Sequence, residues 1–236
     1  MTNPTTSRPI PLALTTLIAV FSALAALGVS GGHDASAHDA TVHARAGVSA
    51  TELRLRNDMR RLWEDHVTWT RLAVISLTSG SADTEATVGR LLRNQSDIGN
   101  AVKPFYGAAA GAQLTALLRR HILVAADLIA AAKAGDQAAV TRQQARWTAN
   151  ADQLAAFLDR ANPRAWKLGP TKAMLHEHLR LTTNEVVARL TENWAADVRA
   201  YDAIHLQALH MADMLSSGIV DQFPARFREP PTRARP

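Results

Sequence analysis

Three histidines of this 236-residue chain recur in one local pattern, and histidine is the commonest metal ligand among protein side chains. His66, His121 and His178 each stand four residues after a large apolar residue and directly before another, at intervals of 55 and 57 residues. A pattern that returns at a nearly constant interval is typical of repeated structural units. The sequence therefore predicts a helical hairpin of about 55 residues that is used three times.

A second set of polar residues lies at the matching distance on the returning helices. Asn94 and Asn150 are 56 residues apart, and His205 takes the third place. The residues of both sets lie 13 to 15 positions from the predicted hairpin turns, on the apolar stripes of their helices. Residues equally far from the turn of an antiparallel hairpin share one height, so we expect a polar layer in the core.

This layer has the composition of a metal site. Three or four neutral imidazoles suit Zn²⁺, Cu²⁺ or Ni²⁺, and helical bundles commonly place metals and cofactors in their cores. Asp202 stands three residues before His205, on the same helical face. That pair is similar to half of a di-iron carboxylate site, but a second half is missing from the sequence, which argues against ferritin-like chemistry. The predicted ligands are His66, His121, His178 and His205, supported by Asn94, Asn150 and Asp202.

Two other interpretations of the histidines remain open. The layer can be a purely hydrogen-bonded one that fixes helix register, as a buried asparagine does in a coiled coil. Alternatively, His38 and His43, near the predicted mature N-terminus, can bind a metal such as copper at the surface. A haem pocket with an axial histidine is a third use of the layer, although no haem motif accompanies it.

The elements that must position the layer are all helical. Aromatic residues make up only 5% of the chain and glycine only 12 residues, which argues against a β-sandwich or barrel. We expect an all-α antiparallel bundle of about six helices, arranged as three hairpins. The last break is open, because either 191–193 forms a turn or a capping box at 182–185 begins one long final helix. The expected helices span about 52–78, 84–102, 112–134, 136–160, 171–190 and 194–218.

The N-terminal segment has the features of an export signal. Arg8 precedes an uncharged run, and Ala35-Ser36-Ala37 is a small-x-small cleavage site, so we expect cleavage after Ala37 and a secreted or extracytoplasmic protein. An uncleaved membrane anchor is the alternative. The chain has no cysteine, which excludes disulfides, thiolate sites and lipoprotein anchoring. The predicted parts are a signal peptide (1–37), a polar linker (38–50), a helical domain (51–223) and a disordered Pro/Arg tail (224–236).

Charge and motifs exclude several function classes. The net charge of +5 includes +3 from the residues after 223, so the domain itself carries too few cations for a nucleic-acid face. The sequence has no Gly-rich phosphate loop and no serine elbow. We therefore do not expect an enzyme of a motif-defined class, and the anticipated partner is a metal ion or a small molecule.

Five segments resemble a group of small exported all-helical proteins of Gram-positive bacteria, over roughly residues 52–224. These segments are 62–71, 91–107, 117–136, 150–158 and 181–190. Members of the group often carry a glycosyltransferase label, which implies a nucleotide-sugar α/β fold that the helical pattern here argues against. The leading interpretation is an exported bundle that binds a metal ion or small ligand through its histidine layer. A ligand-free structural or interaction module of the cell envelope, and an envelope enzyme, are the alternatives.

Overall fold

The computed structural model describes residues 48–228, and five α-helices form most of that part of the chain. The elements are α2 (Ala50–Ser79), α3 (Thr84–Ala134), α4 (Gln137–Ala161), α5 (Leu168–Leu190) and α6 (Trp194–Gln222), followed by a short 3₁₀ turn, η2 (Pro224–Arg226). No β-strand occurs within residues 48–228. The predicted all-α bundle is confirmed, but the number of helices is five rather than about six. The predicted signal peptide and the last eight residues lie outside the described part.

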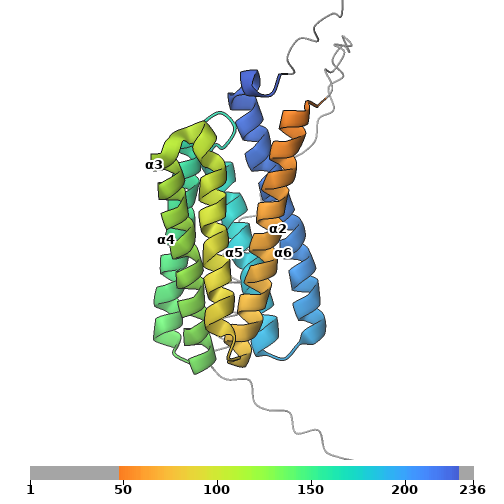
Figure 1. Cartoon of the computed structure of the whole chain (residues 1–236). Helices are drawn as coiled ribbons and strands as arrows, with labels where there is room; N and C mark the ends of the chain where they lie inside the picture. Colours follow the sequence, from red (N-terminus) through yellow and green to blue (C-terminus); the bar gives the residue numbers. More distant parts are fainter. Residues whose placement is uncertain (1–47, 229–236) are drawn as a thin grey trace, which may run out of the picture.

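The helix count differs because α3 contains two of the expected helices. The predicted break at Lys103-Pro104 is wrong, since Pro104 lies inside the helix, and the direction changes at Gly107 (φ 84°, ψ 168°). A positive φ of this kind favours glycine. The two halves of α3 then run back side by side (Figure 1). They approach so closely that a Cβ atom on Gly99 would lie 2.7 Å from the carbonyl oxygen of Gly111, so glycine is required there.

The bundle has two different ends. At one end lie three tight turns, after α2, after α3 and after α5, and we call this the tight-turn end (Figure 1). At the other, the open end, lie the Gly107 bend, the α4–α5 loop, the start of α2 and the end of α6. The open question about the last hairpin is settled in favour of the turn, because α5 ends at Leu190 and Asn193 caps α6 through the backbone N–H of Ala196 at 3.1 Å.

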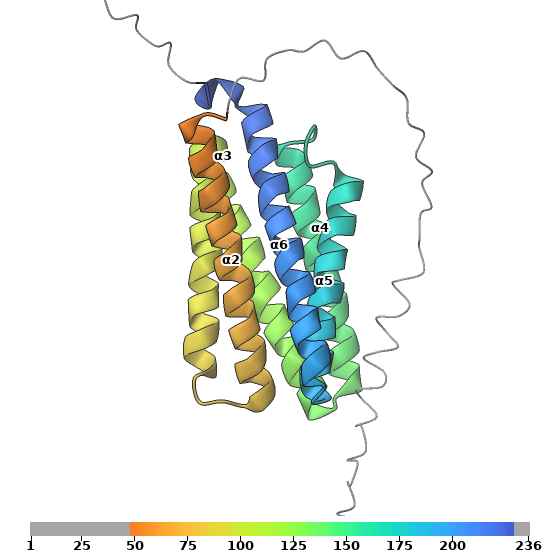
Figure 2. The same ribbon diagram turned by 90° about the vertical axis from the view of Figure 1, so that its right-hand side faces the viewer.

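With the two halves of α3 counted separately, the bundle has six straight helical segments, which we call rods. The rods close into a ring around one core. α2 packs against α3 and α6, α4 against α3 and α5, and α5 against α6, while α2 also reaches α5 (Figure 2). Because both halves of α3 take part, each hairpin contributes two neighbouring rods. Apolar residues from all five helices, including Met59, Val140, Ala155 and Ile219, are almost fully buried in this core.

The packed region extends past the predicted domain end at residue 223. Phe227 is only 7% exposed, and its ring lies 5.9 Å from that of Phe105. The predicted tail boundary at 224 was therefore too early, since an aromatic side chain among the arginines anchors the segment. None of the helices within 48–228 combines the length and the apolar character needed to cross a membrane.

Candidate functional site

Three of the four predicted histidines meet at the middle of the bundle. His66 on α2, His121 on the second half of α3 and His178 on α5 are 2%, 4% and 5% exposed. The ring centre of His178 lies 5.9 Å from that of His66 and 5.9 Å from that of His121. We call these residues the histidine trio. Each comes from the first rod of its hairpin, so alternate rods of the ring each supply one imidazole.

An amide on the second rod of the hairpin orients the ring in two of the three units. The Nδ1 atom of His121 lies 3.0 Å from Asn150 Oδ1, and the amide nitrogen of Asn150 donates to the carbonyl of Leu117 at 3.1 Å. Since only the NH₂ group can donate to that carbonyl, the amide oxygen faces the ring and accepts a hydrogen bond from the Nδ1–H group. The neutral His121 ring then has an unprotonated Nε2.

The α5–α6 hairpin repeats this arrangement with a glutamine. His178 Nδ1 lies 3.1 Å from Gln207 Oε1, and Gln207 donates to the carbonyl of Met174 at 3.2 Å. In both hairpins the amide stands 29 residues after the histidine. The carbonyl that fixes the amide belongs to the residue four positions before the histidine. The neutral His178 ring therefore also carries its proton on Nδ1, and its Nε2 atom is unprotonated.

The unit around His66 differs from the other two. Asn94 donates to the carbonyl of Leu62 at 3.0 Å, in the same way as Asn150. However, Gln95 Nε2 lies 3.2 Å from His66 Nδ1, and the same amide nitrogen donates to the carbonyl of Leu91 at 2.9 Å. The same nitrogen also lies 3.1 Å from Asn94 Oδ1, so the two hydrogens of the Gln95 amide face three acceptors. Because an NH₂ group and not an amide oxygen faces Nδ1 of His66, we expect the proton of the neutral ring on Nε2.

Burial keeps the trio neutral. Removal from water, together with the neighbouring His178 ring, lowers the pKa of His121 to about 3. The pKa of His66 is held well below its usual range by burial and by the two other imidazoles, and burial also lowers the pKa of His178. At neutral pH the trio therefore consists of uncharged rings, which is the form that binds metal ions.

His205 and Asp202 do not join the trio, contrary to the sequence prediction. The Nε2 atom of His205 lies 2.7 Å from Glu64 Oε1 near the surface, and Asp202 is exposed. Gln207 takes the expected place instead. Residues two positions apart in a helix point in directions about 200° apart, so His205 and Gln207 lie on opposite faces of α6. Their similar distance from the turn therefore could not show which of them faces the trio.

Several polar atoms around the trio are buried without a hydrogen-bond partner within residues 48–228. Trp63 Nε1, Trp147 Nε1 and Gln95 Oε1 belong to this group. The Trp63 ring lies 5.3 Å from the His66 ring, and the Trp147 ring lies 5.3 Å from the His121 ring. Buried polar groups in native proteins normally have partners. The trio is therefore bordered by residues whose buried polar atoms have no acceptor or donor among residues 48–228.

A different polar group lies between the trio and the tight-turn end, and we call it the charged cluster. Arg71 of α2 donates to Glu185 of α5 at 2.8 Å and to both oxygens of Asp197 of α6, one of them at 2.8 Å. Arg189 reaches Asp197 at 3.2 Å. The two carboxylates are 1% and 2% exposed. Burial raises the pKa of Glu185, whereas the bonds from the two arginines hold the pKa of Asp197 below its usual value.

Among residues 48–228, no three His, Cys, Asp or Glu side chains stand in an arrangement that already fits a metal ion. The trio is the nearest approach to one, and its ring centres are somewhat too far apart. Comparison of the chain with known protein families, with characterised proteins and with solved structures finds no match. The function must therefore be argued from the geometry of the site.

Proposed function

We propose that the chain is an exported helical-bundle protein that binds a metal ion in its core through the Nε2 atoms of His66, His121 and His178. The observation that carries this proposal is the repeated unit of histidine, amide and backbone carbonyl. Three hairpins supply the same parts and direct one imidazole each to a common centre. The ligand class is the one that the sequence suggested, with three histidines instead of four.

The amides act on the imidazoles as supporting groups do in known metal sites. Metal-binding histidines almost always donate their second ring N–H to a carboxylate, carbonyl or water, which fixes the tautomer and the ring orientation. Asn150 and Gln207 accept from Nδ1 of His121 and His178, so that Nε2 is left for the ion. His66 presents Nε2 in the same way only when its proton moves to Nδ1 and the Gln95 amide turns its oxygen toward the ring.

The distances require only a small closure of the rings. Zn–N bonds of about 2.0–2.1 Å at a tetrahedral or trigonal centre bring the ring centres to about 5.1–5.5 Å from one another. The separations of His66 and of His121 from His178 are 5.9 Å, so in these two pairs the rings must approach by about half an ångström. Three neutral nitrogen ligands suit Zn²⁺ or Cu²⁺.

The alternative is a layer that only fixes the register of the helices. It is supported by the fact that every Nδ1 atom of the trio already has a partner within the chain. In that case the protein is a structural or interaction module of the cell envelope, and the trio contributes to stability without a ligand.

Thermal and denaturant unfolding with and without added metal distinguishes these functions. At a hundredfold excess over its dissociation constant, Zn²⁺ or Cu²⁺ should stabilise the folded protein by about 2.7 kcal/mol. His121→Ala should abolish most of this gain. His205→Ala is the matched control, because its imidazole lies outside the trio, and it should keep the gain.

A third variant that lacks residues 38–47 tests binding at the surface by His38 and His43. If the metal-dependent gain disappears in this variant and survives His121→Ala, the metal binds at the N-terminal segment and the proposal is wrong. The proposal also fails if metal leaves the wild-type transition unchanged. That second result would favour the register layer.

A further inference from the structure

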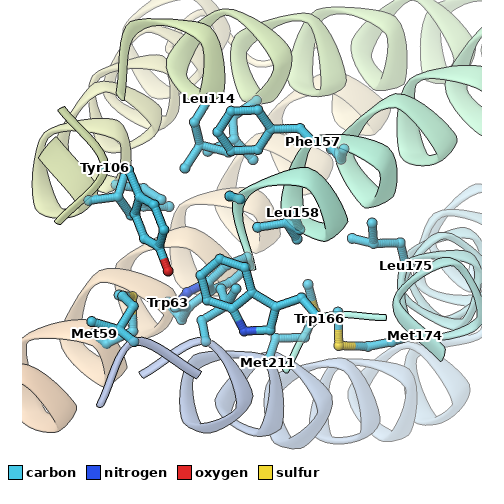
Figure 3. Close-up of a pocket in the computed structure, with 17 residues that line it drawn as sticks. Met59, Trp63, Tyr106, Leu114, Phe157, Leu158, Trp166, Met174, Leu175 and Met211 are labelled. Carbon is cyan, nitrogen blue, oxygen red and sulfur yellow. The ribbon is translucent and has the colours of Figure 1, made fainter. Parts of the chain in front are cut away.

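An apolar cavity lies directly beside the trio, on the side of the open end. Its volume is about 50 Å³, and every helix of the bundle contributes to its lining (Figure 3). Trp63, Leu118 and Leu175 line it and stand three residues before His66, His121 and His178, so the trio forms the neighbouring layer of the core. Met59, Met174 and Met211 supply three flexible side chains to the same wall.

A second, polar hollow lies outside this cavity. It has a volume of about 430 Å³ and is lined by residues 162–165 of the α4–α5 loop together with Asp221 and Gln222. Ala161 and Trp166, which flank that loop segment, line the inner cavity. Residues 161–166 therefore line both hollows, and the polar one offers both a cation, Arg164, and a carboxylate, Asp221.

We propose that the inner cavity binds the apolar end of a small amphipathic molecule, whose polar end lies in the outer hollow. The lining decides the chemistry, because an alkyl group or ring is stabilised there by leaving water, whereas a polar group would be buried without a partner. An apolar cavity of about 150 Å³ in another protein binds benzene or xenon. A cavity of about 50 Å³ accommodates a group of only a few carbon atoms, or a larger one when the methionines move.

Tyr106 of α3 and Trp166 of the α4–α5 loop line the inner cavity close to residues of the polar hollow. The Tyr106 ring lies 5.7 Å from the Trp166 ring, and Tyr106 stands directly before the Gly107 bend. Tyr106 donates to Gln222 Oε1 at 2.6 Å, and Gln222 donates to the carbonyl of Ala161 at 3.1 Å. These bonds are exposed to solvent, so water replaces them at little cost when the side chains part.

The methionine methyl groups provide the test, in wild-type protein without added metal. Xenon is the first probe, followed by n-butanol and by butane-1,4-diol. Labelled methyl spectra should show shifts for Met59, Met174 and Met211 with xenon and n-butanol. Met214, which is absent from the lining, is the internal control and should stay in place. Butane-1,4-diol should shift none of the three, since its second hydroxyl would be buried without a partner.

Two variants sharpen the result. Leu175→Ala enlarges the cavity and should lower the n-butanol midpoint several-fold, whereas Leu206→Ala, at a position 56% exposed, should not change it. Gln222→Ala should speed the exchange of n-butanol, because it removes the bond to Tyr106. The inference is overturned if xenon and n-butanol leave the three methyl groups unshifted, or if the diol shifts them as strongly as n-butanol. None of these outcomes depends on whether the trio binds metal.

Discussion

The histidine trio and the charged cluster are both buried polar groups inside one helical bundle, yet they are buried in opposite electrostatic states. The trio consists of neutral rings whose pKa values burial has lowered. The charged cluster keeps two arginines and two carboxylates in contact, with Glu185 and Asp197 almost fully buried. A group with a pKa near neutrality gives up its charge when it is buried, whereas an arginine cannot.

The two groups also differ in how they arise from the repeat. Each hairpin supplies one histidine and one amide, so the trio is built from three copies of one unit. The charged cluster has no such copies, because it joins only α2, α5 and α6. The comparison suggests that the charged cluster stabilises only the contact between α2, α5 and α6, while the trio arises from the repeated hairpin. The following predictions separate these roles.

Mild acid should produce the largest effect, and it should act through the trio. The folded pKa of each ring lies below the unfolded value of about 6.5, so the unfolded chain binds more protons as the pH falls. The contribution of the trio to stability is therefore complete above pH 6.5 and is lost below it. The loss approaches about 4 kcal/mol per pH unit if all three rings take part. The raised pKa of Glu185 offsets part of this.

Urea unfolding between pH 5 and pH 7.5 measures the effect. A variant with His121→Ala and His178→Ala should show a clearly smaller slope of stability against pH. An equal slope in this variant and in the wild type would mean that other groups control the acid response.

Arg71→Met should have the next largest effect, since it leaves Glu185 and most of the charge of Asp197 without a partner in the core. Breaking a buried ion pair by removing one member costs about 3–5 kcal/mol. Denaturant unfolding at pH 7.5 measures the loss. Lowering the pH should recover part of it, because a protonated Glu185 no longer needs the arginine. Recovery at high pH instead would contradict this explanation.

His121→Ala in the absence of metal should cost less, about 1–3 kcal/mol, through a small cavity and the unpaired oxygen of Asn150. The double variant with Asn150→Ala as well should cost less than the sum of the two single variants, because the bond between them is lost only once. A double-mutant cycle measures this coupling. Strict additivity would show that the 3.0 Å contact between them contributes nothing.

Arg60→Met should have the smallest effect and tests whether burial, and not residue type, gives Arg71 its importance. Arg60 pairs with Asp213 at 2.6 Å, but both side chains are largely open to water. Exposed ion pairs contribute little to stability. The denaturation midpoint should stay close to that of the wild type, and a loss as large as that of Arg71→Met would remove the contrast on which the comparison rests.

Much of this structure could be predicted from periodicity, because helix length and amphipathic spacing are local properties. The three hairpins and the heights of His66, His121 and His178 followed from distances to the turns. The break at Pro104 was placed wrongly, since the helix continues through Pro104 and the bend itself lies at Gly107. The predicted number of helices changes with the interpretation of one such residue, whereas the predicted packing of the two halves of α3 does not.

The amide partners show where sequence reasoning stopped. His205 was predicted from its distance to the turn and its place on the apolar stripe, whereas Gln207 is the residue that lies 29 positions after its histidine, as Asn150 does. That constant spacing was the signal that could have identified the correct residue. The charged cluster carried no such signal, because Arg71, Glu185 and Asp197 are brought together only by the closure of the ring.

The binding of a metal ion by the trio is tested most directly by the imidazole nitrogens themselves. Long-range ¹H–¹⁵N spectra at pH 7.5 should show neutral His121 and His178 protonated at Nδ1, with His66 protonated at Nε2. One equivalent of Zn²⁺ should shift the Nε2 signals of all three rings and bring His66 to the Nδ1 tautomer. If Zn²⁺ leaves these signals unchanged and shifts only those of exposed histidines such as His205, the trio does not bind the metal.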